Sequence, residues 1–400
     1  MQCREASECS GVHGLLHIVR DPRLPQKGGG RKSLKKRFPA SAERAMIQVR
    51  AGSETASTDL DRIETRRERW EASVPAVNLK QWAVHLTKRR LNRMIISASR
   101  RTDIPAFYSR WFMNRIRAGY CVVVNPFNAR QVTRISLAPR DVEVVVFWTR
   151  HAGPILRHLP ELDRLGYRTT FQYTVVGYPR TVDPSVPPLE TALRTFRETA
   201  LRVGPDRITW RYDPVFVSSV TDIPYHRDRF ARIAEALRGL TRHSVVSVMH
   251  RYRKVEKRLK RLAADGIHPL VTAEDAMQSL LADFADAARR NGMQISSCGS
   301  EMDLTSLGIG SGRCIDAETL SRIFGIHLPA SKDPHQRKAC GCSVSKDIGA
   351  YDTCGFGCVY CYATNSRERA RAARRRHDPD AESLGLISTV GLTPCVLGEV

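Results

Sequence analysis

The sequence predicts an α/β fold, in which a parallel sheet closes, wholly or in part, into a TIM-barrel-like (β/α) barrel. Two observations predict this fold. From Met94 onward, short apolar runs rich in β-branched residues alternate with longer segments of helical periodicity. Polar residues also follow the end of nearly every apolar run, where a barrel of parallel strands carries its functional groups.

The elements follow in chain order. The expected strands are the apolar runs at 95–99, 121–125, 142–149, 170–174, 207–212, 245–250 and 293–298. The expected helices occupy 105–118, 151–165, 188–203, 226–239, 251–264 and 272–291. Polar residues stand at the strand ends, at 99–103, 125–126, 148–149, 172–174, 211–214, 250 and 298. Singly, such residues are helix caps or surface groups, but together they predict one polar rim.

The two ends of the chain differ from this pattern. Residues 1–93 are expected to form a poorly ordered basic extension, because basic and glycine-rich stretches occur there without sustained periodicity. We hypothesise that Met94 is the native start; a basic arm that binds nucleic acid is the alternative. The domain is expected to span 94–365, with a further basic helix at 362–376 and a helical or disordered tail over 366–400.

Composition and charge restrict the class of protein. The chain is 42% hydrophobic and 26% charged, as soluble globular proteins are. Its formal net charge is +23, of which residues 94–362 contribute +12 (38 basic and 26 acidic side chains), so a polyanionic partner is electrostatically permitted. No apolar run reaches the roughly 18 residues of a membrane span, so no membrane partner is expected. Eleven cysteines without a signal peptide favour reduced thiols and a cytoplasmic location.

Residues 251–262 form a strongly basic segment with helical periodicity. Val255, Leu259 and Leu262 fall on one face of this helix, which predicts that they pack inward while the basic face is solvated. The alternative is a face that contacts phosphates, because Arg and Lys supply sequence-independent affinity for nucleic acid.

The motif with the most specific chemistry is Cys354-Gly-Phe-Gly-Cys358-Val-Tyr-Cys361. This spacing predicts a tight turn that brings three thiols to one face. Three thiolates suit a [4Fe–4S] cluster that keeps one iron open for another ligand. A structural zinc site or simply buried thiols is the alternative.

A second cysteine group precedes this motif. Cys340 and Cys342 are separated by one glycine, and they complete a set of four thiols with Cys298 and Cys314. Such a set predicts either zinc or an auxiliary iron–sulfur cluster. Because the spacings are long and irregular, the absence of any site stays open as well.

Five segments also carry a resemblance to a known family: 94–108, 146–150, 171–174, 210–214 and the cysteine-containing 340–364. They resemble the bacterial domain of unknown function 1848 family, whose C-terminal cysteine cluster is similar to the loop that radical S-adenosylmethionine (SAM) enzymes carry near their start. Here the motif follows the last elements, so the barrel would be partial or circularly permuted relative to radical SAM enzymes, with 347–351 beside 95–99. Residues 173–188 resemble the spore photoproduct lyase branch of those enzymes.

The resemblance implies a cofactor set and a mechanism. Cys354, Cys358 and Cys361 would hold three irons of a [4Fe–4S] cluster, and SAM would chelate the fourth iron. One electron from the reduced cluster would cleave SAM to methionine and a 5′-deoxyadenosyl radical. Tyr360 matches the aromatic position that packs near the adenine. The candidates for binding SAM or substrate are Arg100, Arg101, Asp103, Arg211 and Asp213; a structural Arg–Asp pair at the rim is the alternative.

Three functions therefore stay open at the level of sequence. The first is a radical SAM-like enzyme that takes electrons from a donor such as flavodoxin or ferredoxin and acts on an unknown substrate. The second is a nucleic-acid-directed protein similar to a repair lyase. The third is a non-enzymatic zinc or iron–sulfur protein.

Overall fold

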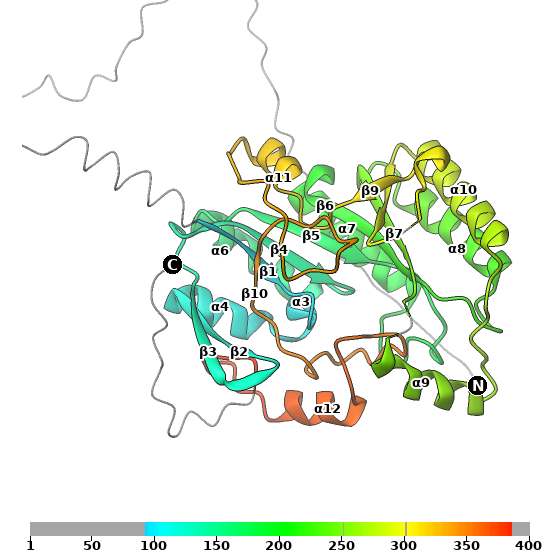
Figure 1. The fold of residues 1–400 in the computed structure, drawn as a ribbon. Helices are drawn as coiled ribbons and strands as arrows, with labels where there is room; N and C mark the ends of the chain where they lie inside the picture. The colour runs from blue at the N-terminus through cyan, green and yellow to red at the C-terminus, as the bar shows by residue number, and fades with distance from the viewer. Residues whose placement is uncertain (1–92, 251, 301, 386–400) are drawn as a thin grey trace, which may run out of the picture. The chain divides into compact units, whose positions relative to one another are not determined.

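An eight-stranded parallel sheet is the centre of the part of the chain that the structure describes, residues 93–250, 252–300 and 302–385 (Figure 1). The structure is a computed structural model, and all of these residues belong to the unit Val77–Val400. In spatial order the strands are β10 (Lys346–Asp347), β1 (Met94–Ala98), β4 (Val142–Thr149), β5 (Thr169–Thr174), β6 (Ile208–Val215), β7 (His243–Val248), β8 (Gln294–Cys298) and β9 (Gly310–Gly312). The predicted α/β fold with a parallel sheet is thus confirmed.

One face of this sheet packs against several of the helices. The described helices are α3 (Ile104–Phe107), α4 (Ser109–Ala118), α5 (Gly153–Leu156), α6 (Leu159–Arg164), α7 (Leu189–Val203), α8 (Ile223–Ala236), α9 (Arg253–Ala264), α10 (Glu274–Arg290), α11 (Ala317–Phe324) and α12 (Arg367–Arg375), with short 3-10 turns at Pro205–Arg207 and Thr305–Leu307. Aromatic side chains form the contact: Phe147 of β4 lies 5.3 Å from Phe112 of α4, and Trp210 of β6 lies 4.6 Å from Phe230 of α8, measured between ring centroids. This face is the larger core.

The opposite face of the sheet carries a smaller core and the polar residues. Val144 and Val146 of β4 and Val245 of β7 pack there against α11 and the segment that leads to Cys340 and Cys342. In Figure 1 the orange chain leaves α11, crosses the sheet, passes through β10 and then continues toward α9 and α12. Because both faces of β4 are covered, its sequence is an almost unbroken apolar run.

The structure corrects one predicted strand. The run at 121–125 is a strand, β2 (Tyr120–Asn125), but it pairs antiparallel with β3 (Asn128–Ser136) in a separate two-stranded sheet. Asn125 and Pro126 therefore belong to a hairpin turn and not to the rim of the parallel sheet. A short run of apolar, β-branched residues indicates a strand without indicating its partner, which explains the error.

Other boundaries also differ from the sequence-based expectation. The helix expected at 105–118 is two helices, α3 and α4, and that at 151–165 is α5 and α6. The strand expected to end at His250 ends at Val248. Val255, Leu259 and Leu262 are buried, as predicted for α9, and the expected basic helix near 362–376 is α12. The predictions for residues 1–92 and 386–400 lie outside the described residues. No helix in the described ranges is long and apolar enough to cross a membrane.

Candidate metal centre

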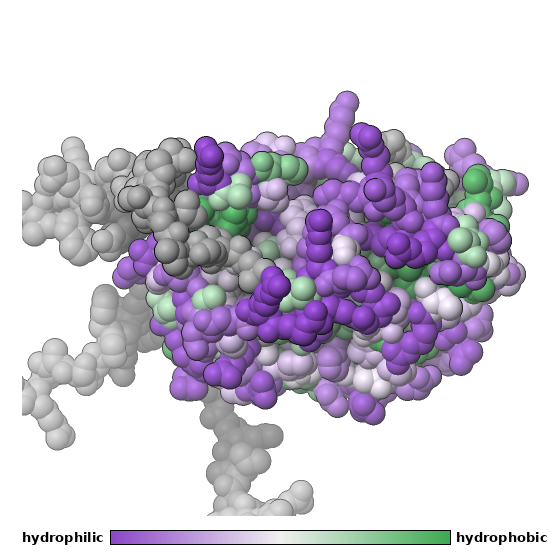
Figure 2. All heavy atoms as spheres, turned by 90° about the horizontal axis from the view of Figure 1, so that it is seen from below, coloured by the Kyte–Doolittle hydropathy of each residue, from purple (hydrophilic) through white to green (hydrophobic). Residues whose placement is uncertain are grey.

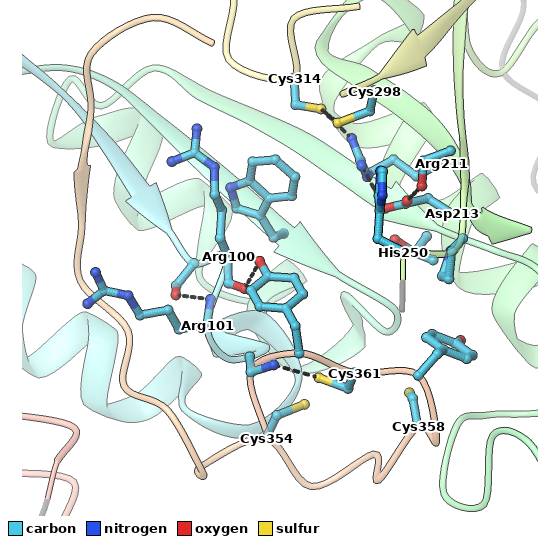
Figure 3. Close-up of a pocket in the computed structure, with 18 of the residues that line it drawn as sticks. Arg100, Arg101, Arg211, Asp213, His250, Cys298, Cys314, Cys354, Cys358 and Cys361 are labelled. Carbon is cyan, nitrogen blue, oxygen red and sulfur yellow. Dashed lines mark hydrogen bonds and ion pairs between the residues drawn. The ribbon is translucent and has the colours of Figure 1, made fainter. Parts of the chain in front are cut away.

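All seven cysteines of the two predicted groups line one cavity of about 430 Å³ (Figure 3). The cavity lies at the carboxyl ends of β1, β4, β6, β7 and β8, because parallel strands bring these ends to the same edge of the sheet. Among the predicted rim residues, 99–103, 148–149, 174, 213–214, His250 and Cys298 line it. Figure 3 shows Cys354, Cys358 and Cys361 at one end and Cys298 and Cys314 at the other.

The two-residue strand β10 brings the 354–361 loop to this edge. Asp347 of β10 pairs in parallel register with Ser97 of β1, as the sequence predicted for 347–351 beside 95–99. The Ser97 and Ser99 hydroxyls donate hydrogen bonds to the Asp347 carboxylate at 2.7 and 2.8 Å. Gly349 follows so close to Ser99 that a Cβ would collide with its side chain. The chain leaving β10 is therefore fixed where the first strand ends.

The cysteine loop itself is held by charged side chains. Asp352 adopts a left-handed conformation (φ 56°) and accepts hydrogen bonds from the Asn365 and Ser366 backbone N–H groups, which closes the loop. From α9, the Arg258 guanidinium donates to the carbonyl oxygens of Val359, Cys361 and Thr364. Three backbone acceptors on one guanidinium fix the loop without covering its thiols.

Each thiol of the loop accepts at least one N–H donor. Arg150 Nη1 lies 3.2 Å from the Cys358 sulfur, and the Ala363 N–H lies 3.4 Å from the Cys361 sulfur. The Phe356 and Asp103 N–H groups act on Cys354. Without a metal, burial raises the pKa of the Cys354 thiol to about 12 and that of Cys358 well above its usual range. Such N–H donors are the partners that thiolate ligands of iron–sulfur clusters take.

A buried triad beside Cys358 was not singled out from the sequence. Arg150 pairs with Asp183 at 2.7 Å, and the Tyr360 hydroxyl donates to Asp183 at 2.8 Å and also meets Arg150. Burial by itself lowers the pKa of Arg150. The electrostatic interactions with Asp183 and Tyr360 are stronger together than this effect, so the pKa of Arg150 lies well above its usual value. Burial also raises the pKa of Tyr360. The triad fixes a cation against the Cys358 sulfur.

The four other cysteines gather at the opposite end of the cavity. The Cys314 and Cys298 sulfurs are 3.0 Å apart, and Cys342 interacts with both Cys314 and Cys340. The hydrogen bond from Cys314 lowers the pKa of Cys298 to about 7, and those from Cys314 and Cys340 lower the pKa of Cys342 further below its usual value. All seven thiols are free.

Neither group is already arranged as a finished metal site. Within 93–250, 252–300 and 302–385, no three His, Cys, Asp or Glu side chains surround one point as metal ligands do. Binding at either group therefore requires the thiols to turn inward. The donor sets nevertheless suit metal: the loop offers three thiols with N–H donors, and the second group offers four adjacent thiols.

The comparison with known families agrees with the resemblance in sequence. The model of the family described as Domain of unknown function (DUF1848) matches residues 95–363. The chain belongs to this family. No curated protein and no solved structure matches it significantly.

In this DUF1848 chain, the predicted arginines lie between the two cysteine groups. Arg211 Nη1 lies 2.8 Å from the Cys314 sulfur, and the Arg100 guanidinium interacts with Cys342. Both guanidiniums stand over the Trp148 ring, at 5.1 and 5.2 Å from its centroid. Arg100 Nη2 and Trp148 Nε1 are buried and have no hydrogen-bond partner among the described residues. Both residues line the cavity.

The remaining predicted ligand-binding residues have structural partners in the DUF1848 chain. Asp103 caps α3 through the Ala106 N–H and also accepts from Thr149 and Arg150, so its carboxylate is occupied. Asp213 pairs with Arg211 at 2.6 Å, which is the rim pair weighed as an alternative. Arg101 lies 3.9 Å from Asp347 and over the Tyr351 ring.

Arg150, Asp183 and Arg258 are the residues of this DUF1848 site that sequence reasoning missed. Arg150 had one signal, because it directly follows the strand-end residues Trp148 and Thr149. Arg258 lay in the basic helix, where its contacts with the cysteine loop have no signature in the local sequence. Asp183 lies in an irregular segment, and its partners are 33 and 177 residues away.

Proposed function

We propose that this protein is an iron–sulfur enzyme of the radical SAM type, with a [4Fe–4S] cluster on Cys354, Cys358 and Cys361. The observation that carries the proposal is the position of this loop. Its three thiols line the one cavity into which the carboxyl ends of the parallel strands also project their polar residues. A cluster there would face a space large enough for a small-molecule ligand.

The fold supports the same proposal. Since β10 and β9 stand at the two ends of the strand order, we interpret the sheet as a partial, circularly permuted (β/α) barrel. In this arrangement the loop after β10 takes the position beside β1 that the corresponding loop has in radical SAM enzymes.

Several residues of the chain would hold the cluster and its ligand in place. When bound and reduced, the cluster would supply the low-potential electron for cleavage of SAM. Arg150 donates to the Cys358 sulfur and so stabilises the thiolate form, while Asp183 and Tyr360 keep that guanidinium in place. Arg258 holds the loop backbone, so the three thiols keep a common orientation. Arg100 is the predicted SAM- or substrate-binding residue that still has a free buried donor.

The test is an assay for SAM cleavage. The protein is reconstituted anaerobically with iron and sulfide, reduced with dithionite, mixed with SAM and analysed for 5′-deoxyadenosine. Wild type is expected to form the product, and Cys358→Ala to lose it. Cys121→Ala is the matched control, because Cys121 is buried in the β2–β3 hairpin and does not line the cavity. A wild type without product, or an undiminished Cys358→Ala variant, would refute the proposal.

One surface favours a nucleic acid as the second candidate, in line with a repair-lyase-like protein. α9 and α12 flank the cysteine loop; α9 is rich in Arg and Lys, and α12 is rich in Arg. Figure 2 shows the face seen from below, where Figure 1 places both helices, as mostly hydrophilic. If this face binds phosphates, the affinity for single- and double-stranded DNA should fall steeply with salt. An affinity that does not change with salt would exclude phosphate contacts.

A further inference from the structure

We propose that Cys298, Cys314, Cys340 and Cys342 together bind a single divalent metal ion of the zinc type. This centre is separate from the one at the 354–361 loop and does not depend on the proposed function. The four thiols come from three places in the chain: the end of β8, the segment after β9, and the turn before β10. All four line the same cavity, and three of them are buried.

The spacing of the sulfurs favours one ion over a cluster. A tetrahedral zinc site with Zn–S bonds of about 2.3 Å places its sulfurs about 3.8 Å apart. The Cys298 and Cys314 sulfurs are 3.0 Å apart, so a zinc ion between them requires them to separate by less than about 1 Å. Cys342 interacts with Cys314 and with Cys340, which makes the four thiols contiguous. A [4Fe–4S] cube would push such sulfurs much further apart.

The loop that carries Cys354, Cys358 and Cys361 provides the contrast within this molecule. Its three thiols take separate N–H donors, and within residues 302–385 no sulfur–sulfur hydrogen bond joins them. The loop thus offers three thiols that each meet the protein separately, whereas the second group offers thiols that contact one another.

The surroundings of the four thiols fit a tetrathiolate. One divalent ion with four thiolates carries a net charge of −2, and two guanidiniums reach the group, Arg211 at Cys314 and Arg100 at Cys342. Arg100 Nη2 and Trp148 Nε1 are buried donors without a partner among the described residues. N–H donors around the sulfurs are the outer contacts that stabilise a zinc–thiolate site. The thiols would release their protons on binding.

The position of the group indicates what the metal would do. β9 and β10 stand at the two ends of the strand order, and the described residues record no ladder pairing between them. Cys298 and Cys314 flank β9, while Cys340 and Cys342 precede β10. One ion bound by all four would tie the two edges of the sheet together. It would also fix Arg211 and Trp148, which form a wall of the cavity.

The experiment measures zinc and iron in anaerobically purified full-length protein and in three variants. Wild type should hold about one zinc per chain. Cys342→Ser should lose most of this zinc and keep its iron, Cys358→Ala should lose iron and keep zinc, and Cys121→Ser should keep both. X-ray absorption at the zinc edge of wild type needs no variant and should show four sulfur neighbours at about 2.3 Å.

Several results would overturn the proposal. One is a wild type without zinc; another is zinc with nitrogen or oxygen neighbours. Loss of about four irons from Cys342→Ser would identify an auxiliary cluster instead. A disulfide between Cys298 and Cys314, detected by mass spectrometry of the anaerobic protein, would also exclude the zinc site. The zinc site is tested by zinc content and the radical SAM function by formation of 5′-deoxyadenosine. Either proposal can therefore fail without the other.

Discussion

The two cysteine groups share one cavity, yet their surroundings differ in kind. Cys354, Cys358 and Cys361 sit on a single loop, and each sulfur takes an N–H donor from the protein. The four thiols of the second group come from distant segments and contact one another. The difference teaches that thiol number alone does not set the chemistry. The sulfurs of the local motif meet N–H donors, whereas those of the convergent segments meet other sulfurs.

The largest effect on stability is expected at the triad beside Cys358. Asp183→Asn leaves the Arg150 cation buried without its counter-ion, which should lower the free energy of unfolding by about 3–5 kcal/mol. Chemical denaturation of the variant and of wild type measures this. With increasing denaturant, the variant should release iron from the 354–361 loop before it releases zinc from the four-thiol group. The reason is that Arg150 contacts the loop thiol Cys358 and none of the four other thiols.

An exposed ion pair supplies the control. Asp283 pairs with Arg227 at 2.6 Å, but both side chains are more than 40% exposed. Asp283→Asn should therefore change the free energy of unfolding by less than about 1 kcal/mol. Equal free energies of unfolding for Asp183→Asn and Asp283→Asn would show that the triad of Arg150, Asp183 and Tyr360 does not stabilise the folded protein.

The next largest effect is a pH dependence of the free energy of unfolding, caused by His226, which lies outside both cysteine groups. His226 is buried, with its ring nitrogens bonded to the Tyr212 hydroxyl and the Phe216 carbonyl. Burial lowers its pKa to about 4, against a partial opposing effect of Phe216 and Asp222. The folded state thus binds the proton less well than the unfolded state. Stability present above about pH 6.5 should fall by up to about 3 kcal/mol as pH drops toward 4.

This titration separates acid unfolding from acid release of metal. His226→Gln should flatten the loss of unfolding free energy between pH 6.5 and 4, measured by denaturation at each pH, without altering the pH at which iron and zinc leave. An unchanged pH profile in this variant would show that His226 does not govern the acid sensitivity.

The smallest effect is expected from the clamp on the cysteine loop. Arg258→Gln removes hydrogen bonds to loop carbonyls and should destabilise the loop by about 1–2 kcal/mol. Iron should then leave faster under a chelator, while zinc at the second group should leave at the wild-type rate. Lys257→Gln is the matched control, because it removes an equal charge from an exposed position of the same helix. Equal rates of iron loss in both variants would contradict a role for Arg258.

The sequence predicted those parts of the structure that depend on local patterns. The β-branched run of β4 gave its bounds, and the C-x3-C-x2-C spacing of Cys354 to Cys361 identified the loop. The placement of 347–351 beside β1 was predictable because first and last strands of a barrel are neighbours. β10 itself, with two residues, is too short for periodicity to reveal.

What the sequence missed depends on contacts between distant residues. The strand predicted from the apolar run of β2 was correct, but nothing in that run indicated pairing with β3 instead of the parallel sheet. Arg258 was expected either in solvent or on a phosphate, and its actual acceptor, the Val359 carbonyl, lies 101 residues further along the chain. The contact between Arg211 and Cys314 likewise spans 103 residues.

The most direct test of two different metal centres in one cavity is the metal content of wild type itself. Protein purified without oxygen, reconstituted with iron and sulfide and desalted is analysed for iron, acid-labile sulfide and zinc. We predict about four irons and about four sulfides per chain at the loop, and about one zinc per chain at the four thiols. Zinc without acid-labile sulfide would contradict the cluster, and about eight irons without zinc would contradict the difference between the groups.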